Sequence, residues 1–246
     1  MKHCIIVGAG PGLGEAIARK FGANGYGVGL IARQEGALAH QAARLGALGV
    51  KTGYTVADAG DAGQIGHALD QLQAQSGPCD VLIYNAAVLR SGGPMDLSPE
   101  TLRAEFEVNL VGALVAAQKV APQMAVRGNG TILLTGGGLA LEPYPEWTSL
   151  ALGKAALRSL AFSLYKALAP KGVHVSVIAV CGIVEPGGPF DPDAVTGEYL
   201  RLATTPNGVA DREVIIQPSG TDPHYNDPER KHVATSIAPH HARSNT

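Results

Sequence analysis

The sequence predicts an α/β protein built on one doubly wound, seven-stranded parallel sheet with helices on both faces. Strand-like and helix-like segments alternate along the chain, which is typical of a parallel sheet. A glycine-rich turn, from Gly8 to Gly14, directly follows the first apolar segment. The chain has 246 residues, of which 46% are hydrophobic and 16% charged, and this suits a single domain of that class.

The expected strands are short apolar runs separated by helical patterns. They comprise residues 4–7, 28–31, 52–56, 81–84, 132–134, 173–180 and 214–216. Helices are expected between them near residues 13–23, 35–48, 62–75, 99–126 and 149–168, with a short one from Asp191 to about Leu202.

Two of the expected helices have sequence features that indicate a buried face or a starting point. In the first, Leu13, Ile17 and Phe21 recur every four residues, the apolar stripe of a helix packed on a sheet. The fourth should begin at Ser98-Pro99-Glu100, which combines a capping hydroxyl, a proline at the first helical position and an acid near the positive helix end. Its expected buried face consists of Leu102, Phe106, Leu110 and Leu114.

Composition narrows the classes of function. We expect a globular domain over residues 1–217 and a polar tail over 218–246, with four prolines and four histidines.

The formal charge of −2 and scattered basic residues favour neither a nucleic-acid nor an anionic-membrane partner. The apolar start is broken at Gly8, so we expect no signal peptide or membrane span and a cytoplasmic protein. Neither the cysteines nor the tail histidines have metal-ligand spacing, so no metal is expected.

The glycine turn has a physical reason of its own. A strand that runs into a tight glycine turn and then a helix points backbone N–H groups and the positive helix end at one spot, where a pyrophosphate can bind. Such turns also occur without a ligand. The expected phosphate-binding residues are Gly8, Gly10, Pro11, Gly12, Leu13 and Gly14.

Other residues follow the pattern of a known family in the right order. Gly8, Gly12 and Gly14 match GxxxGxG, Asp58 matches the acid after the third strand, and Asn85-Ala86-Ala87 stands for Asn-Ala-Gly. Asn109 matches the asparagine of that family's fourth helix and Lys154 its lysine, whereas Cys181-Gly182 departs from the Pro-Gly that usually follows the sixth strand. Over residues 1–217 the chain resembles a short-chain dehydrogenase/reductase.

That resemblance implies a Rossmann fold, a nicotinamide cofactor and a small-molecule substrate. It also implies further cofactor contacts, at Asp58, Ala59, Asn85, Ala86, Ala87, Lys154, Gly182 and Val184. The segment 182–202 would form the substrate side, with a short loop that closes over the site.

The end of the second strand indicates the form of the cofactor. An NAD site normally places a carboxylate there for the ribose hydroxyls, whereas a 2′-phosphate needs a cation. This chain has Ala32 and then Arg33, which favours NADP(H). The alternative is that Arg33 is simply a solvent-exposed arginine at a strand end.

The catalytic set is incomplete. In enzymes that the chain resembles, a tyrosine four residues before the lysine exchanges the carbonyl proton, and a serine thirteen residues earlier holds the substrate oxygen. The tyrosine position holds Leu150, and the serine position falls in Gly136-Gly137-Gly138; neither leucine nor glycine has a side chain that can donate a hydrogen bond. Lys154 and Asn109 remain as catalytic candidates, and Tyr144 is added as a replacement acid. Lys154 could act through water, and three other nearby polar residues could also replace the acid: Glu142, Glu146 and Ser149.

Three classes of function therefore remain open. The first is an atypical NADP(H)-dependent oxidoreductase that reduces an activated C=C, C=N or carbonyl group without the usual tyrosine. The second is an NADPH-binding or sensor protein without catalysis. The third is a non-redox lyase, isomerase or cyclase on the same fold.

Two expectations concern association. The resemblance implies a homodimer or homotetramer formed through the fourth and fifth helices, and the fifth offers an apolar face: Leu157, Leu160, Ala161, Leu164 and Leu168. The same face would also serve to pack on the sheet. In the tail, His224 and Tyr225 are the residues that would matter if it folds over an active site.

Overall fold

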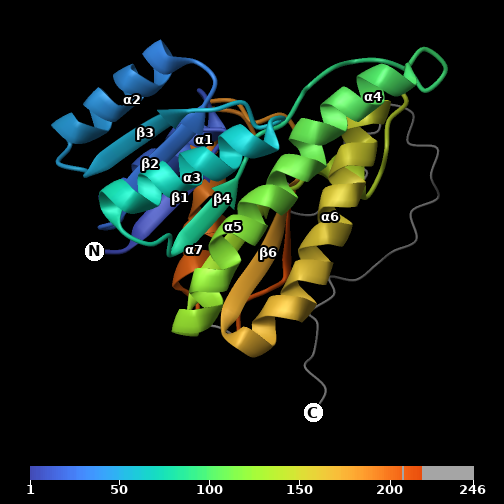
Figure 1. The fold of residues 1–246 in the computed structure, drawn as a ribbon. Helices are drawn as coiled ribbons and strands as arrows, with labels where there is room; N and C mark the ends of the chain where they lie inside the picture. The colour runs from blue at the N-terminus through green and yellow to red at the C-terminus, as the bar shows by residue number, and fades with distance from the viewer. Residues whose placement is uncertain (207, 218–246) are drawn as a thin grey trace.

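The computed structural model of the protein describes residues 1–206 and 208–217, and these form the expected parallel sheet (Figure 1). The seven strands lie in the order β3-β2-β1-β4-β5-β6-β7, and every neighbouring pair is parallel. Their bounds are β1 (His3–Val7), β2 (Gly27–Ala32), β3 (Thr52–Val56), β4 (Val81–Tyr84), β5 (Gly130–Thr135), β6 (Val173–Val180) and β7 (Glu213–Ile216). The strand order reverses between β1 and β4, and at such a point the carboxyl ends of the strands border a crevice.

Helices cover both faces of the sheet (Figure 1). Their bounds are α1 (Leu13–Ala23), α2 (Glu35–Ala47), α3 (Ala62–Ser76), α4 (Pro99–Phe106), α5 (Gly112–Arg127), α6 (Thr148–Leu168) and α7 (Pro192–Thr204). One core lies between the sheet and α3, α5 and α6, and the other between the sheet and α1, α2 and α7. None of the helices in the described part of the chain is long and apolar enough to cross a bilayer.

The two cores follow from the alternation of side chains along each strand. In β1, Ile5 and Val7 belong to the first core, whereas Cys4 and Ile6 belong to the second. All five β1 residues are buried, because helices cover both faces of a parallel sheet. The continuous apolar runs that predicted the strands are therefore the direct signature of this architecture.

The fourth predicted helix, 99–126, is interrupted. It begins as expected, with the Ser98 Oγ accepting a hydrogen bond from the Thr101 N–H at 3.1 Å. At Glu107–Val111 it widens into a π-helical turn, and it then continues as α5. Such turns are often found at functional sites, and this one contains Asn109.

The predicted buried face of that helix was wrong. Leu102, Phe106, Leu110 and Leu114 are only half-buried. The buried positions are instead mostly small residues, together with a few larger ones: Glu105, Asn109, Gly112, Ala113, Ala116, Ala117, Val120, Ala121 and Met124. Small side chains let the helix approach its neighbours closely, which a ranking by hydrophobicity does not reveal.

Gly112 shows how tight this approach is. A Cβ atom there would lie 2.2 Å from the Ala59 carbonyl oxygen and 2.4 Å from the Tyr84 Oη. The Tyr84 hydroxyl, at the end of β4, donates a hydrogen bond to the Val108 carbonyl in the π-helical turn. β4 and the π-helical turn are therefore held together beside the carboxyl edge of the sheet.

Candidate functional site

The glycine turn after β1 needs glycine for two different reasons. Gly8 and Gly12 have positive φ angles, of 89° and 84°. A Cβ atom on Gly8 would lie 2.4 Å from the Ala86 nitrogen, and one on Gly14 would lie 2.4 Å from the Gly8 oxygen. Gly10 and Gly12, by contrast, have open space where a Cβ atom would be. The turn is thus packed tightly on its inner side and open on the other.

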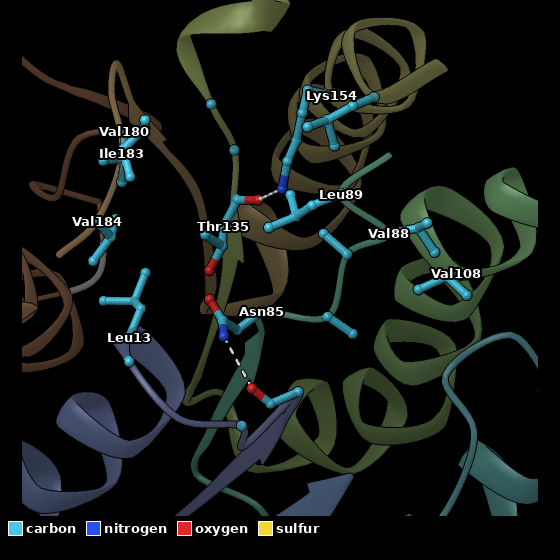
Figure 2. Close-up of a pocket in the computed structure, with 18 of the residues that line it drawn as sticks. Leu13, Asn85, Val88, Leu89, Val108, Thr135, Lys154, Val180, Ile183 and Val184 are labelled. Carbon is cyan, nitrogen blue, oxygen red and sulfur yellow. Dashed lines mark hydrogen bonds between the residues drawn. The ribbon is translucent and has the colours of Figure 1, made fainter. Parts of the chain in front are cut away.

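A cavity of about 1070 Å³ lies along the carboxyl ends of the strands, where the strand order reverses. Figure 2 shows a part of it, with side chains from several of these strand ends and from α6. Nearly all of the predicted cofactor residues line it: Gly8, Gly10, Pro11, Gly12, Leu13, Arg33, Asp58, Ala59, Asn85, Ala86, Ala87, Lys154, Gly182 and Val184. Gly14 does not line the cavity, because it packs against Gly8 where the helix meets the turn.

Two charged side chains mark the end of the cavity beside β2 and β3. Arg33 is exposed and takes part in none of the ion pairs among the described residues. Asp58 is held by its own loop, since its Oδ1 accepts a hydrogen bond from the Gly60 N–H at 2.9 Å. The guanidinium of Arg33 is thus available to an anionic ligand.

The Asn85 side chain connects two strand ends. Its Nδ2 donates a hydrogen bond to the Gly8 oxygen at 2.9 Å, as Figure 2 shows. This bond joins the loop after β4 to the glycine turn after β1. Asn85 therefore lines the cavity and also fixes the position of the glycine turn relative to the loop after β4.

Lys154 is the buried cation of the site. It is 7% exposed, and its Nζ donates a hydrogen bond to the Thr135 carbonyl at 2.7 Å (Figure 2). Burial removes water from the ammonium group and lowers the pKa of Lys154 to about 8. In the described part of the chain no carboxylate forms an ion pair with it.

Leu150 and Gly137 both line the cavity beside Lys154. Leu150 lies one helical turn before Lys154 on α6 and is 6% exposed. A Cβ atom on Gly137 would lie 3.6 Å from the Lys154 Cγ, in ordinary contact. The two positions that would carry an acid and a substrate-holding hydroxyl thus hold a leucine side chain and a glycine, which has no side chain.

The other catalytic candidates lie in different surroundings. Asn109 is buried behind the cavity wall, where its Oδ1 accepts a hydrogen bond from the Val88 N–H at 2.8 Å. Tyr144 and Glu146 line the cavity, whereas Glu142 and Ser149 do not. Asn109 thus contacts the backbone of a wall residue, and Tyr144 lines the cavity itself.

Sequence reasoning missed most of the wall around Lys154. Apolar side chains form much of this wall, which makes the space beside Lys154 apolar: Val88, Leu89, Leu139, Trp147, Ile183 and Phe190. It also missed Thr135, the last residue of β5, although the ends of parallel strands are known to meet at ligand sites.

The predicted segment after β6 lies beside this wall. Gly182 packs against Phe190 so closely that a Cβ atom would lie 2.0 Å from the ring. Asp191 then caps α7, accepting hydrogen bonds from the N–H groups of Asp193 and Gly187, each at 2.8 Å. The described residues contain no group of three or more His, Cys, Asp and Glu side chains that could hold a metal ion. The tail histidines and Tyr225 lie outside the described residues.

This fold and site belong to a defined class of proteins. Residues 2–187 match the family model of the short chain dehydrogenases, and the chain is a member of that family. It is 30% identical to the oxidoreductase UcpA of Salmonella typhimurium over 213 residues, which cover 81% of this chain and 79% of the relative.

Solved structures of the family have the same fold. One is a metagenomic short-chain oxidoreductase in complex with NADP, with a TM-score of 0.81 and 28% identity, covering 89% of this chain and 97% of the other. Another is an alcohol dehydrogenase from the archaeon Thermococcus sibiricus complexed with 5-hydroxy-NADP, with a TM-score of 0.81, 26% identity, and coverage of 92% and 100%.

The lowered pKa of Lys154 predicts a pH-dependent stability. The unfolded lysine holds its proton up to about pH 10.5, whereas the folded one releases it near 8, so the unfolded state binds more protons between these values. The burial penalty is therefore largest below pH 8 and disappears as the pH rises to 10.5. Lys154→Met should raise the free energy of unfolding at pH 7 by about 1–2 kcal/mol, the lost hydrogen bond offsetting part of the gain.

Denaturant unfolding at pH 7 and pH 10 measures this effect. The gain should shrink at pH 10. The control is Lys166→Met, an exposed lysine of the same helix, which should change stability by less than about 0.5 kcal/mol. A Lys154→Met protein that is less stable than the wild type at both pH values would contradict the burial argument.

Proposed function

We propose that this chain is an NADP(H)-dependent reductase of a small molecule with an activated C=C, C=N or carbonyl group, working without the usual tyrosine acid. The observation that carries the proposal is the cavity itself. It combines an intact cofactor side, from the glycine turn to Lys154, with an apolar space that holds Leu150 and Gly137. Membership of a family of named oxidoreductases supports the redox class.

The residues present fit a dinucleotide. Gly10 and Gly12 leave open space beside the turn, so phosphates can approach the backbone N–H groups at the start of α1. Arg33 supplies the cation that a 2′-phosphate requires, and two similar solved structures carry NADP or a derivative of it. Lys154 would donate hydrogen bonds to the hydroxyls of the nicotinamide ribose.

The apolar side of the cavity limits which substrate groups could be reduced there. When bound, the reduced nicotinamide supplies a hydride. Neither Leu150 nor Gly137 can protonate an oxygen beside it. We therefore favour an activated alkene, which would take the hydride at its β-carbon, or a C=N group in its iminium form, because neither requires an alkoxide to be protonated as it forms. For a carbonyl substrate, Tyr144 is the cavity-lining phenol in the described part of the chain that could donate the proton.

A second candidate rests on the same observation. A cofactor side that is intact beside a site without the tyrosine and serine also suits an NADPH-binding protein that performs no catalysis. It would need only the glycine turn, Arg33, Asp58, Asn85 and Lys154, which line one cavity. Transfer of the hydride distinguishes the two candidates.

Arg33 should set the preference for NADPH. Arg33→Ala removes the cation proposed to contact the 2′-phosphate, so the Kd for NADPH should rise about 10- to 100-fold while that for NADH changes less than about twofold. Calorimetric titration without substrate measures both. Arg44→Ala, an exposed arginine of α2 outside the cavity, is the control. Equal losses for the two cofactors would contradict the assignment.

Deuterium transfer tests the reductase directly. NADPH deuterated at C4 of the nicotinamide is incubated with an enone, a cyclic imine and a ketone, and the products are analysed by mass spectrometry. We expect deuterium in the enone or imine product, and less in the alcohol. Samples without protein are the control for direct reduction. NADPH binding with no transfer to any substrate would favour the non-catalytic candidate.

We also propose that the chain forms a homodimer or homotetramer through α4, α5 and α6. The half-buried Phe106, Leu110 and Leu114 offer apolar surface there. Light scattering after gel filtration should give a dimer or tetramer, and Leu114→Glu should lower the mass. Gln118→Glu, at an exposed position one turn further along α5, should not. A monomeric wild-type protein would refute the proposal.

A further inference from the structure

Tyr199 is a buried polar residue that the site described above does not use. It lies on α7 and is 0% exposed. Its hydroxyl forms a hydrogen bond with the Thr135 Oγ1 at 2.8 Å. The two residues are 64 positions apart in the chain, so the bond joins the helix after the substrate segment to the end of β5.

Thr135 makes a second polar contact through its main chain. Its carbonyl accepts the hydrogen bond from the Lys154 Nζ at 2.7 Å, and both residues line the cavity. Figure 2 shows the ammonium group of Lys154 directed at this carbonyl. Thr135 thus forms a hydrogen bond with Tyr199 through its side chain and accepts one from Lys154 through its carbonyl.

The carbonyl of Thr135 is held from two directions. The next residue, Gly136, belongs to the same peptide plane, and its N–H donates to the Ile178 carbonyl at 2.8 Å. That bond fixes the side of the plane facing β6. The hydrogen bond between the Tyr199 hydroxyl and the Thr135 Oγ1 fixes the Thr135 side chain, and with it the Cα atom from which the carbonyl extends.

Helix α7 is itself anchored to both halves of the site. Asp193 pairs with Arg19 of α1, the helix that follows the glycine turn. Phe190, directly before the Asp191 cap, packs on Gly182 and lines the cavity. Helix α7 therefore contacts three parts of the structure: α1 through Asp193, the segment after β6 through Phe190, and the end of β5 through Tyr199.

We propose that Tyr199 is a positioning residue for Lys154 and acts through Thr135. It keeps the carbonyl in line with the ammonium group, so that Lys154 is held where the cofactor would meet it. Only the contact between Lys154 and the cofactor rests on the proposed function. A role for Tyr199 as the missing acid is disfavoured, because its hydroxyl does not line the cavity and burial raises the pKa of Tyr199.

Two measurements on the Tyr199→Phe protein test the proposal. The carbonyl favours the charged form of the lysine, so a looser bond should lower the pKa of Lys154 further below about 8. An NMR titration of lysine-labelled protein without cofactor measures it, with Lys154→Met to assign the signal. Calorimetry should show the Kd for NADPH raised about three- to tenfold.

The matched control is Thr196→Val. Thr196 is also a fully buried residue of α7, and the substitution removes a hydroxyl that donates a hydrogen bond to the Asp193 carbonyl and not to Thr135. It should lower thermal stability about as much as Tyr199→Phe and leave the pKa of Lys154 unchanged. Thr135→Val should reproduce the effects of Tyr199→Phe, and the double variant should add little to either.

The outcomes separate this proposal from the proposed function. If Tyr199→Phe leaves the pKa of Lys154 unchanged, or shifts it no more than Thr196→Val does, Tyr199 is only structural and the proposal fails. If the wild-type protein binds no NADPH, the proposed function fails. The titration without cofactor still decides the role of Tyr199 in that case.

Discussion

The site depends on one steric constraint, the close approach of the backbone after β1 to the backbone after β4. A side chain on Gly8 would collide with the main chain at Ala86, and one on Gly14 would collide with Gly8 itself. Because these backbones touch, the Asn85 amide can reach the Gly8 carbonyl and hold the two loops together. The cavity lies along the resulting crevice, with α1 starting directly from the turn.

Around this constraint the molecule buries a cation at a cost. Lys154 has lost its water, and what it gains in return is one hydrogen bond, which its Nζ donates to the main-chain carbonyl of Thr135. A single neutral acceptor does not restore the solvation of an ammonium group, which is why its pKa is low. Such a cost is typical of a functional site, where stability is given up for a group held ready to act. Leu150 and Gly137 add no polar side chain beside it, so the part of the cavity next to Lys154 is largely apolar.

The π-helical turn and α7 connect this site to the rest of the fold. The turn carries Asn109, whose oxygen holds the Val88 N–H in the cavity wall, and Tyr84 ties the turn to β4. On the opposite face of the sheet, α7 packs in the core that contains α1. The π-helical turn on one face of the sheet and α7 on the other thus both contact the carboxyl ends of the strands. A substitution far from the cavity in sequence can therefore change the position of a residue that lines it.

The sequence by itself determined the architecture and picked out residues that the structure brings together along one side of the cavity, from the glycine turn to Lys154. Each strand is a short apolar run buried on both faces, and a glycine turn after the first strand has few structural alternatives, so local pattern was sufficient for these. Local pattern failed on the fourth helix, where leucines suggested a buried face and the structure buries alanines and glycine instead. Only the tertiary structure brought Tyr199 to Thr135 and Thr135 to Lys154, because contacts across 64 and 19 positions leave no periodic signal in the chain. Burial, which lowers the pKa of Lys154, is likewise a property of the packed molecule and of no single segment.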